Sequence, residues 1–319
     1  MPEIKAVTLD ECVSAITCAK DPLVLMHVRP DGDTVGSAMA LCEIFAAMGK
    51  DACYASADKI PERLAFLTEG LCEAKSFYGR CAIAIDVASP GQLGELYDKV
   101  EVALTIDHHA VNTPFSPHYT ISGASSAGEV LYGIAKRLED LGLIKITKRI
   151  AERLYAAMSS DTGGFLFSNA TSDTYRHAAE LIEHGIDHAD INHKLFMSKS
   201  QSQISAEGLV ASKIKCCANG KIAYATISKA DMDNVGLSSV DFDCGIDVVR
   251  SLMGAEVALI VKETDRGFKA SLRSTGANVA EIASRHGGGG HIRAAGCTVD
   301  AESVDSAGEI LVKELEVLF

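Results

Sequence analysis

Short apolar runs that alternate with helix-like stretches constrain the fold of this chain more than any other feature of its sequence. Residues 23–28, 82–85 and 102–106 are almost wholly apolar and are bounded by polar residues. Strands that are covered on both faces of a parallel sheet have this composition. The stretch 34–48, which ends before Gly49, has the apolar spacing of a helix. The alternation predicts an α/β domain whose mainly parallel sheet has helices on both faces.

The pattern changes in the last third of the chain. Helical patterns recur up to residue 196, and the polar stretch 197–205 (MSKSQSQIS) follows them. Beyond it, we predict strands and helices at 222–227, 256–261, 268–272, 278–286 and 301–318. At about 150 residues per domain, 319 residues correspond to about two domains. We therefore predict a catalytic domain over 1–196, a linker over 197–205 and a smaller α+β domain over 206–319.

Composition excludes several classes of protein. The chain has 43 acidic and 30 basic residues, which gives a formal net charge of −13. Such acidity disfavours binding of long duplex nucleic acid, because basic residues must replace the counterions of the phosphates. A small anionic substrate is still compatible, because a local site can be positive on a negative protein.

Neither a membrane nor export is expected for this chain. The sequence has no run of about 18 apolar residues, and its acidic N-terminal stretch lacks the features of a signal peptide. The ten cysteines are scattered and form no C-x-x-C pair, so a zinc ribbon is not expected. Scattered cysteines suit buried thiols in a reducing cytoplasm, where we expect this chain to act.

Carboxylate and imidazole residues follow the predicted strands at the points where those strands end. They are His27, Asp31, Asp33, Asp86, the run Asp107-His108-His109 and, after a predicted helix, Asp161. The carboxyl ends of parallel strands meet at one edge of a sheet, so we expect these side chains to converge. Carboxylates and imidazoles without thiolates suit Mn²⁺, Fe²⁺, Co²⁺ or Zn²⁺. A set of this size suits two ions, which are the usual device for hydrolysing phosphate esters.

Each of these motifs has an ordinary structural explanation when it is taken singly. The Asp31-Gly32-Asp33 sequence is most often a turn, Asp107 suits a helix cap, and His108-His109 suits a surface pair. Their joint placement after successive strands favours the metal site over these explanations.

A run of four glycines at residues 287–290 is the second unusual feature. Backbone N–H groups of such a run can converge into a nest that binds an anion. His291 and Arg293 add donors, and between Lys262 and Arg293 six basic residues outnumber three acidic ones, a local charge of +3. The alternatives are a flexible linker for the glycines and a solvated strand face for the basic residues. We predict an anion-binding region that comprises Arg273, Gly288, Gly289, Gly290, His291 and Arg293.

These motifs resemble those of a known family. His27-x-x-Pro-Asp31-Gly-Asp33, Asp86, Asp107-His108-His109 and Asp161-Thr-Gly are similar to the successive motifs of the DHH phosphoesterases. The segment Gly-Gly-Gly-Gly-His291-x-x-Ala-Ala-Gly resembles the signature of the associated DHHA1 domain. The resemblance covers nearly the whole chain, and the two-domain size is similar to that of the stand-alone bacterial nanoRNases and pAp phosphatases.

The resemblance implies a pair of Mn²⁺ ions, with other divalent ions as alternatives. One ion would be held by His27, Asp31 and Asp86, and the other by Asp33, Asp86, His108 and Asp161. Asp107 would orient its neighbours, and His109 would face the substrate phosphate. Arg273, His291 and the glycine run would hold the other end of the substrate, with the active site in a cleft between an N-terminal DHH domain and a C-terminal DHHA1 domain.

The activity implied by the resemblance is hydrolysis of short oligonucleotides to mononucleotides and of 3′-phosphoadenosine 5′-phosphate (pAp) to AMP. Expected partners are therefore short oligonucleotides or nucleotides, and a homodimer is one candidate oligomeric state. A cyclic-dinucleotide phosphodiesterase and a catalytically silent nucleotide-binding regulator are the alternatives. The glycine-rich segment argues against an inorganic pyrophosphatase, and 319 residues are too few for a RecJ-type exonuclease.

Overall fold

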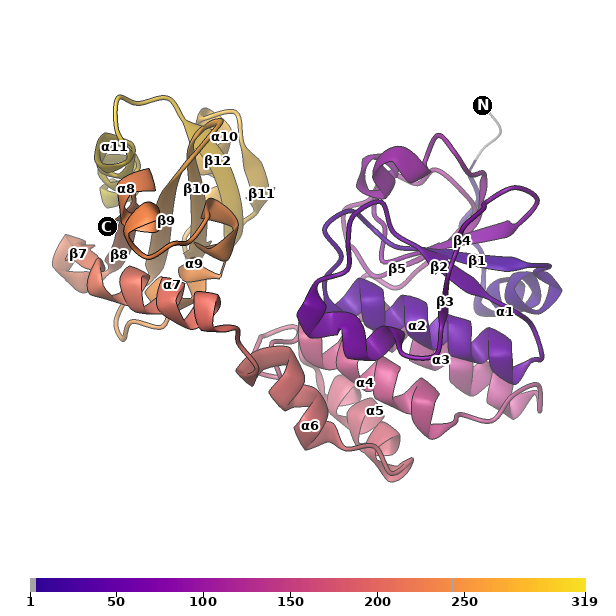
Figure 1. The fold of residues 1–319 in the computed structure, drawn as a ribbon. Coiled ribbons are helices and arrows are strands. Elements are labelled where there is room, and N and C mark those ends of the chain that lie inside the picture. The colour runs from indigo at the N-terminus through magenta and orange to yellow at the C-terminus, as the bar shows by residue number, and fades with distance from the viewer. Residues whose placement is uncertain (1–3, 243) are drawn as a thin grey trace. The chain divides into compact units, whose positions relative to one another are not determined.

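The computed structural model describes residues 4–242 and 244–319, and the chain divides into two compact units (Figure 1). The first unit ends at Ser198 and the second begins at Lys199. Each unit has a six-stranded sheet and an apolar core of its own. The predicted class, a parallel α/β unit followed by a smaller α+β unit, is confirmed. The boundary falls inside the stretch 197–205, where helix α7 (Gln201–Ser212) also begins.

The first sheet is wholly parallel and has the order β3-β2-β1-β4-β5-β6. Its strands are β1 (Pro22–Leu25), β2 (Cys53–Ala55), β3 (Cys72–Glu73), β4 (Cys81–Ile85), β5 (Val102–Asp107) and β6 (His118–Thr120). The strand order reverses between β1 and β4. In open parallel sheets, ligands bind in the crevice outside the carboxyl ends of the strands at such a point.

α-Helices cover one face of this sheet, whereas a short 3₁₀ helix and loop residues cover the other, so the α-helices that we predicted on both faces lie on one face. The helices are α1 (Leu9–Cys18), α2 (Gly32–Ala47), α3 (Ala127–Asp140), α4 (Lys148–Asp161), α5 (Ser172–Glu183) and α6 (His188–Asn192). Along β1, Val24 joins the core under the helices, whereas Leu23 and Leu25 pack beneath Leu93 of the 3₁₀ helix η2 (Pro90–Leu96). This alternation follows from the two-residue period of a strand.

Helix α2 lies in the interior of the first unit, since nearly all of its residues are buried. The Asp31 carboxylate caps its N-terminus, accepting hydrogen bonds from the backbone N–H groups of Asp33 and Thr34. Gly49 ends the helix with a φ of 74°, the left-handed conformation common at helix ends. A Cβ atom at Gly36 would lie 2.8 Å from the carbonyl oxygen of Arg153, so glycine is what lets α2 pack closely on α4.

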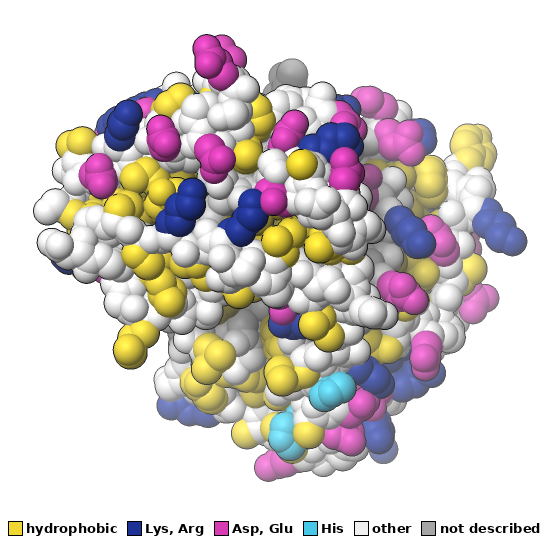
Figure 2. Space-filling view, turned by 60° about the vertical axis from the view of Figure 1, so that its left-hand side comes forward, with side chains coloured by type: hydrophobic (Ala, Val, Ile, Leu, Met, Phe, Trp, Pro, Cys, Tyr) yellow, Lys and Arg dark blue, Asp and Glu magenta, His cyan; other side chains and the backbone are white. Residues whose placement is uncertain are grey.

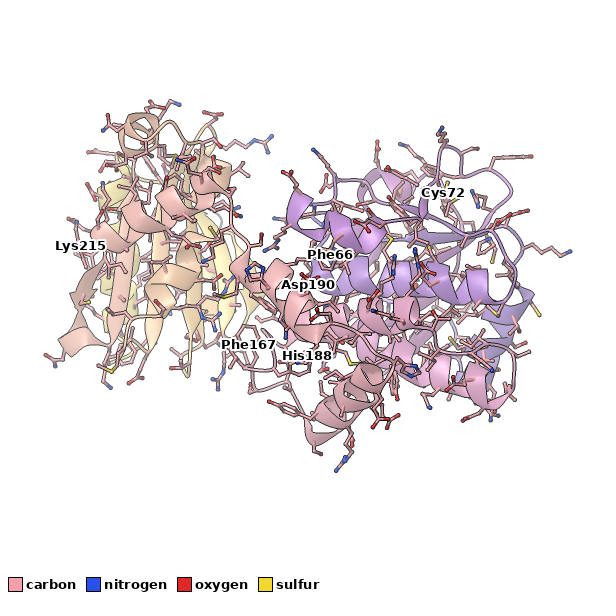
Figure 3. All side chains as sticks on the ribbon, turned by 60° about the horizontal axis from the view of Figure 1, so that its bottom comes forward. Phe66, Cys72, Phe167, His188, Asp190 and Lys215 are labelled. Atoms are coloured by element: carbon pink, nitrogen blue, oxygen red, sulfur yellow. The ribbon has the colours of Figure 1, made fainter. Side chains whose placement is uncertain are left out.

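The remaining short helices of this unit are η1 (Glu62–Thr68) and η3 (His193–Met197). Lys194 pairs with Asp190 at 2.6 Å and lies 5.1 Å from the centre of the Phe66 ring, and these contacts link η3 to η1. Asp190 and Phe66 are labelled in Figure 3. Among the described residues, no helix is both long and apolar enough to cross a membrane.

The second sheet is mixed and has the order β11-β12-β10-β9-β8-β7, in which only β8 and β9 are parallel. Its strands are β7 (Lys215–Cys217), β8 (Ile222–Ile227), β9 (Val257–Thr264), β10 (Gly267–Ser274), β11 (Gly289–His291) and β12 (Ala294–Val299). The helices α10 (Val279–Arg285) and α11 (Val304–Glu316) pack on one face, and α7 and α9 (Gly245–Arg250) on the other. Shorter helical segments are η4 (Ala218–Gly220), α8 (Lys229–Asn234) and η5 (Ser239–Phe242).

Candidate metal centre

The predicted metal ligands lie at the carboxyl edge of the first sheet, where the strand order reverses. They converge from the end of β1, the start of α2, the end of β4, the end of β5 and the last turn of α4. Their donor atoms form three groups, within each of which the atoms lie no more than 4.8 Å apart. The groups are His27, Asp31 and Asp86; Asp33, His108 and Asp161; and Asp86, His108 and His109. The fold therefore brings together all six residues that the sequence indicated.

Asp86 lies between two sets of donors. Its Oδ2 atom is 3.4 Å from Nε2 of His27, and its Oδ1 atom is 3.5 Å from Nε2 of His108. His27 Nε2 is also 3.6 Å from Asp31 Oδ1, and His108 Nε2 is 3.8 Å from Asp33 Oδ2. These separations are too long for good hydrogen bonds but suit atoms that bind one ion, since ligands at about 2.1 Å lie roughly 3 Å apart. Asp86 Oδ1 is buried and accepts no hydrogen bond from the described residues, and the donor set around it fits a divalent ion.

Local backbone geometry fixes the ligands on β4 and α2. Asp86 has a φ of 61°, and its backbone N–H donates to the carbonyl of Ile106 at 2.9 Å, which holds the turn after β4 against β5. A Cβ atom at Gly32 would lie only 2.2 Å from Oγ of Ser160. Glycine is therefore required between Asp31 and Asp33, because the start of α2 lies directly against the end of α4.

Residues 124–128, which we call the 124–128 segment, contact three of the candidate ligands, directly or through Asn169. The N–H groups of Ala127 and Gly128 donate to the two carboxylate oxygens of Asp33, at 2.7 and 3.0 Å. Nδ1 of His108 lies 3.3 Å from the carbonyl oxygen of Ala124. Asn169 joins the third ligand to this segment, since its amide donates to the carbonyls of Ser125 and Asp161, at 3.0 and 3.2 Å.

Glu129 in turn holds the 124–128 segment in place. This buried carboxylate accepts a hydrogen bond from the N–H of Ser125 at 2.7 Å and lies 2.9 Å from Nδ1 of His177. Sequence reasoning missed Glu129, Asn169 and the role of the segment. The pattern Ser126-x-x-Glu129 marks a helix start in the sequence, and Ser126 does cap α3, but that pattern does not reveal a link to Asp33.

We expect Glu129→Ala to weaken binding of Mn²⁺ by about 10- to 100-fold, the usual effect of removing a group that orients metal ligands. The loss arises because the Ser125 N–H is left without its buried acceptor and the 124–128 segment shifts under Asp33 and His108. Glu129→Gln keeps an acceptor oxygen and is the matched control. Calorimetric titration of the metal-free variants with Mn²⁺ measures the effect, and equal affinities in the two variants would contradict it.

The charges of the cluster change the proton affinity of each ligand. Burial, together with Asp86 and Asp161, raises the pKa of Asp33 well above its ordinary value. Burial likewise raises the pKa of Asp161 to about 6. Burial would lower the pKa of both imidazoles, but the neighbouring carboxylates outweigh it and raise the pKa of His27 to about 11 and of His108 to about 10. The metal-free site therefore retains protons at neutral pH.

Binding of a divalent ion is expected to displace these protons. His27 and His108 must be neutral to act as ligands, and both have pKa values well above 7 in the metal-free site. The apparent affinity for Mn²⁺ should therefore increase with pH between about 6 and 8, by about tenfold per pH unit for each proton released. Titration calorimetry in buffers of different ionisation enthalpy counts the protons. Binding that is independent of pH would contradict this pattern of protonation.

Asp107 and His109 form a pair beside the ligands. Asp107 Oδ1 lies 2.7 Å from Nδ1 of His109, and this hydrogen bond raises the pKa of His109 against the opposing effect of burial. Asp107 is almost wholly buried and belongs to none of the three donor groups. The pair therefore has the arrangement of a carboxylate that orients an imidazole.

The predicted anion-binding residues lie together at one end of the second sheet. Arg273 on β10 is paired with Ala294 on β12, which is paired with His291 on β11. Directly paired residues point to the same face, so Arg273 and His291 flank the small side chain of Ala294. Burial lowers the pKa of Arg273, and its guanidinium donates to the carbonyl of Leu272 at 2.9 Å. Arg293 donates instead to the carbonyl of Thr275.

The second half of the glycine run lies in the short strand β11 and not in the nest that we expected. Gly289 and Gly290 pair with Gly296 and Ala295 of β12. A Cβ atom at Gly288 would lie 2.2 Å from the carbonyl oxygen of Gly296, and one at Gly290 would lie 2.4 Å from that of Ala294. Close approach of the two strands therefore explains the glycines at 288 and 290.

Comparisons with known proteins agree with these observations. Residues 22–158 match the model of the DHH family, N-terminal domain, and residues 219–316 match that of the DHHA1 domain. The "Bifunctional oligoribonuclease and PAP phosphatase NrnA" of Thermus thermophilus is 31% identical over 90% of this chain and 86% of its own. The protein of the same name from Bacillus subtilis is 26% identical over 97% of each chain.

A solved structure supports the fold. The exopolyphosphatase-related protein from Bacteroides fragilis superimposes with a TM-score of 0.87 at 23% identity, covering 97% of this chain and 96% of its own. Both sheets, the edge where the acidic and imidazole residues converge, and the two matched domains fit one family. The chain therefore belongs to the DHH family of phosphoesterases, and its second unit carries the DHHA1 domain.

Proposed function

We propose that this chain is a cytoplasmic hydrolase that uses two divalent ions, preferably Mn²⁺, to cleave short oligoribonucleotides to mononucleotides and pAp to AMP. The observation that supports this most is the placement of Asp86, whose two carboxylate oxygens face two different histidines. The names of the relatives from T. thermophilus and B. subtilis support both substrates. All ten cysteines are free, as is usual in a reducing compartment.

The ligands divide into two sets that share Asp86. His27, Asp31 and Asp86 would hold one ion, and Asp33, Asp86, His108 and Asp161 would hold the other. Two divalent ions held by these residues would supply a hydroxide nucleophile at neutral pH and would neutralise charge on the phosphate. The 124–128 segment and Glu129 keep three of the ligands in fixed orientations.

His109 would act on the phosphate itself. Its Nδ1–H donates to Asp107, and the raised pKa favours the protonated ring, so Nε2–H is available as a second donor. We infer that this donor neutralises charge on a non-bridging oxygen as the bond to the leaving ribose oxygen breaks. Asp107 would act by fixing the ring and by favouring its charged form.

Arg273 and His291 would bind the end of the substrate that is not cleaved. Arginine is charged at any physiological pH and can grip a phosphate with two hydrogen bonds. The residues near them on this face are small: Ala294 lies between Arg273 and His291, and Gly296 is paired with Gly289 two residues further along the strands. Small residues here would leave room for a nucleotide. The role of Gly288, Gly290 and Arg293 would be to hold β11 and its neighbouring loop in place.

Arg273→Ala is expected to raise KM for pAp by about 10- to 100-fold with a smaller change in kcat, since a hydrogen bond to a charged group is worth about 1.5–3 kcal/mol. Arg273→Lys keeps the charge but loses the pair of parallel hydrogen bonds, so its KM should lie between that of the wild type and that of Arg273→Ala. Steady-state kinetics on pAp measures this. An unchanged KM in Arg273→Ala would remove this residue from the substrate site.

The proposal restricts substrates to short strands. The net charge of −13 disfavours long polyanions. On the face drawn in Figure 2, Lys and Arg side chains are interspersed with Asp and Glu and do not merge into one basic tract.

Product analysis in Mn²⁺ with four substrates tests the function. We expect mononucleotides from a two-nucleotide RNA and AMP from pAp, with little product from a cyclic dinucleotide or from pyrophosphate. Faster hydrolysis of the cyclic dinucleotide than of the other substrates would instead identify a cyclic-dinucleotide phosphodiesterase. Tight nucleotide binding without any product would instead identify a regulator that has lost catalysis.

A further inference from the structure

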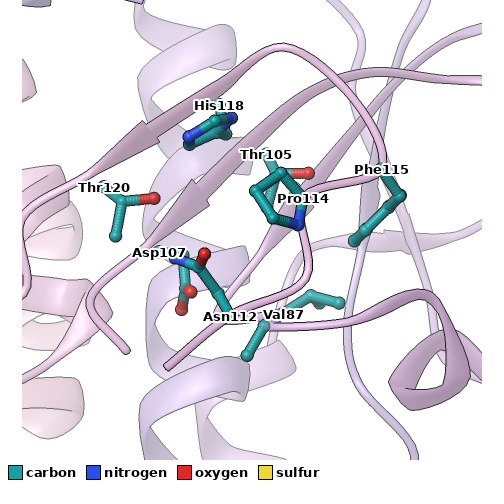
Figure 4. A pocket seen from close by; sticks show the side chains of 9 residues that line it. Val87, Thr105, Asp107, Asn112, Pro114, Phe115, His118 and Thr120 are labelled. Carbon is teal, nitrogen blue, oxygen red and sulfur yellow. The ribbon is translucent and has the colours of Figure 1, made fainter. Parts of the chain in front are cut away.

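A small pocket, with room for about one water molecule, lies at the β5–β6 edge of the first sheet and reaches the Asp107 side chain (Figure 4). We call it the Asp107 pocket. Asp107, His118 and Thr120 line it, together with Thr105 and Asn112. None of these residues except Asp107 belongs to the site described above, and the proposed mechanism assigns the pocket no role.

The strand register places four polar side chains on one face. In the parallel pair β5–β6, Thr105 is paired with His118, and Asp107 is paired with Thr120. Alternate residues of a strand share a face, so all four side chains point to the same side of the sheet. That side is opposite the helical core, since Leu104 and Ile106 of β5 point into the core.

Three polar atoms at this pocket are buried and have no hydrogen-bond partner among the residues that the structure describes. They are Oδ2 of Asp107, Nδ1 of His118 and Oγ1 of Thr120. Their neighbour Thr105 differs, because its hydroxyl lies 2.7 Å from that of Ser116. Buried polar atoms in native proteins are almost always hydrogen-bonded, and a polar pocket with two to four such groups is the usual place for an ordered water.

The backbone of β6 fixes the two side chains that face Asp107. The N–H of His118 donates to the carbonyl of Lys5 at 3.1 Å, and its own carbonyl accepts from the N–H of Val7 at 2.8 Å. His118 is therefore held between the N-terminal segment and β5. Both His118 and Thr120 line the pocket.

We propose that His118 and Thr120 are positioning residues, which hold the Oδ2 oxygen of Asp107 through water bound in the Asp107 pocket. Asp107 presents its other oxygen to His109 at 2.7 Å. A carboxylate anchored at one oxygen only can rotate about its χ2 bond, so support at Oδ2 fixes the orientation of the His109 ring. This inference rests on the proposed function, because it assigns the pair Asp107–His109 to the phosphate.

Thr120→Val tests the inference, because it removes the hydroxyl and keeps the shape and the strand preference of the residue. We expect kcat for pAp to fall by about 10-fold or more, as for other groups that orient a site residue, while KM and the Mn²⁺ affinity change less than about twofold. Thr120→Ser, which keeps the hydroxyl, should restore most of kcat. His118→Asn keeps a polar atom near the position of Nδ1 and should be more active than His118→Phe.

Kinetics and a crystal structure together separate this inference from the proposed function. Water within hydrogen-bond distance of both Asp107 and Thr120 in wild type, and its loss in Thr120→Val, would support the inference even if pAp is not the substrate. Wild-type kcat in Thr120→Val, or equal losses in the Val and Ser variants, would overturn it. Failure of the wild-type protein to cleave either substrate would overturn the proposed function instead.

Discussion

Asp86→Asn is expected to lower hydrolysis of pAp and of a two-nucleotide RNA by about a thousandfold or more. This exceeds the 10- to 100-fold loss expected for groups that only orient ligands, because Asp86 contributes to both sets. An amide of the same shape offers one neutral oxygen and one N–H in place of two anionic oxygens. His27 and His108 each lie about 3.5 Å from one of the two Asp86 oxygens, so in the variant one histidine would face the neutral oxygen and the other the N–H group.

The number of bound ions is the second readout for this variant. Metal analysis after equilibrium dialysis should give two ions per chain for the wild type and fewer than two for Asp86→Asn. Asp98→Asn makes the same chemical change at an exposed position and should behave as wild type. Full activity of Asp86→Asn with two bound ions would show that Asp86 does not join the two sets.

His109→Gln is expected to lower kcat by about 10²- to 10⁴-fold, the usual contribution of a positioned proton donor. Unlike Asp86→Asn, it should leave two ions bound, because His27, Asp31, Asp33, Asp86, His108 and Asp161 are intact. Comparing kcat with the number of bound ions therefore separates the two roles. Loss of an ion in His109→Gln would instead make His109 a ligand, as its proximity to Asp86 and His108 permits.

The pH profile of the wild type provides a further check on His109. The hydrogen bond to Asp107 raises the pKa of His109 above its ordinary value of 6.5. A protonated donor is lost as pH rises through that pKa, so kcat should decline on the alkaline side of the profile. This decline should be absent in His109→Gln, because glutamine does not titrate.

The sequence was sufficient to predict the elements that carry the ligands. The strands β1, β4 and β5 are wholly or almost wholly apolar runs, and a parallel sheet places the residues after them at one edge. The strand at Ile222–Ile227 and the helices at Val279–Arg285 and Val304–Glu316 also lie where their local patterns predict them. These predictions succeeded because each depends on neighbouring residues and on one general rule of sheet topology.

Other features depend on contacts between residues far apart in the sequence. The hydrogen bond from Ala127 to Asp33 joins positions separated by 94 residues, and no local sequence pattern predicts it. The short strands β3, β6, β7 and β11 have two or three residues each, too few to show a period. The glycine run is compatible with an anion nest and with close strand packing, and the register of β11 on β12 selects the latter.

The residues that line the Asp107 pocket could not be identified from the sequence either. His118 and Thr120 are unremarkable in the sequence, since a histidine and a threonine in an edge strand need no explanation. Only the pairing of Thr120 with Asp107 brings three unpartnered polar atoms to one place. Residues that support the candidate site from behind are therefore found from the structure, whereas the convergence of its candidate ligands could be predicted from the sequence.

Anomalous diffraction from crystals grown with Mn²⁺ shows directly whether two ions bind at Asp86. We expect two anomalous peaks about 3.5–4 Å apart, one on each side of the Asp86 carboxylate. One peak should be ligated by His27 and Asp31, and the other by Asp33, His108 and Asp161. A single peak, or two peaks that do not both lie beside Asp86, would show that Asp86 does not bind two ions.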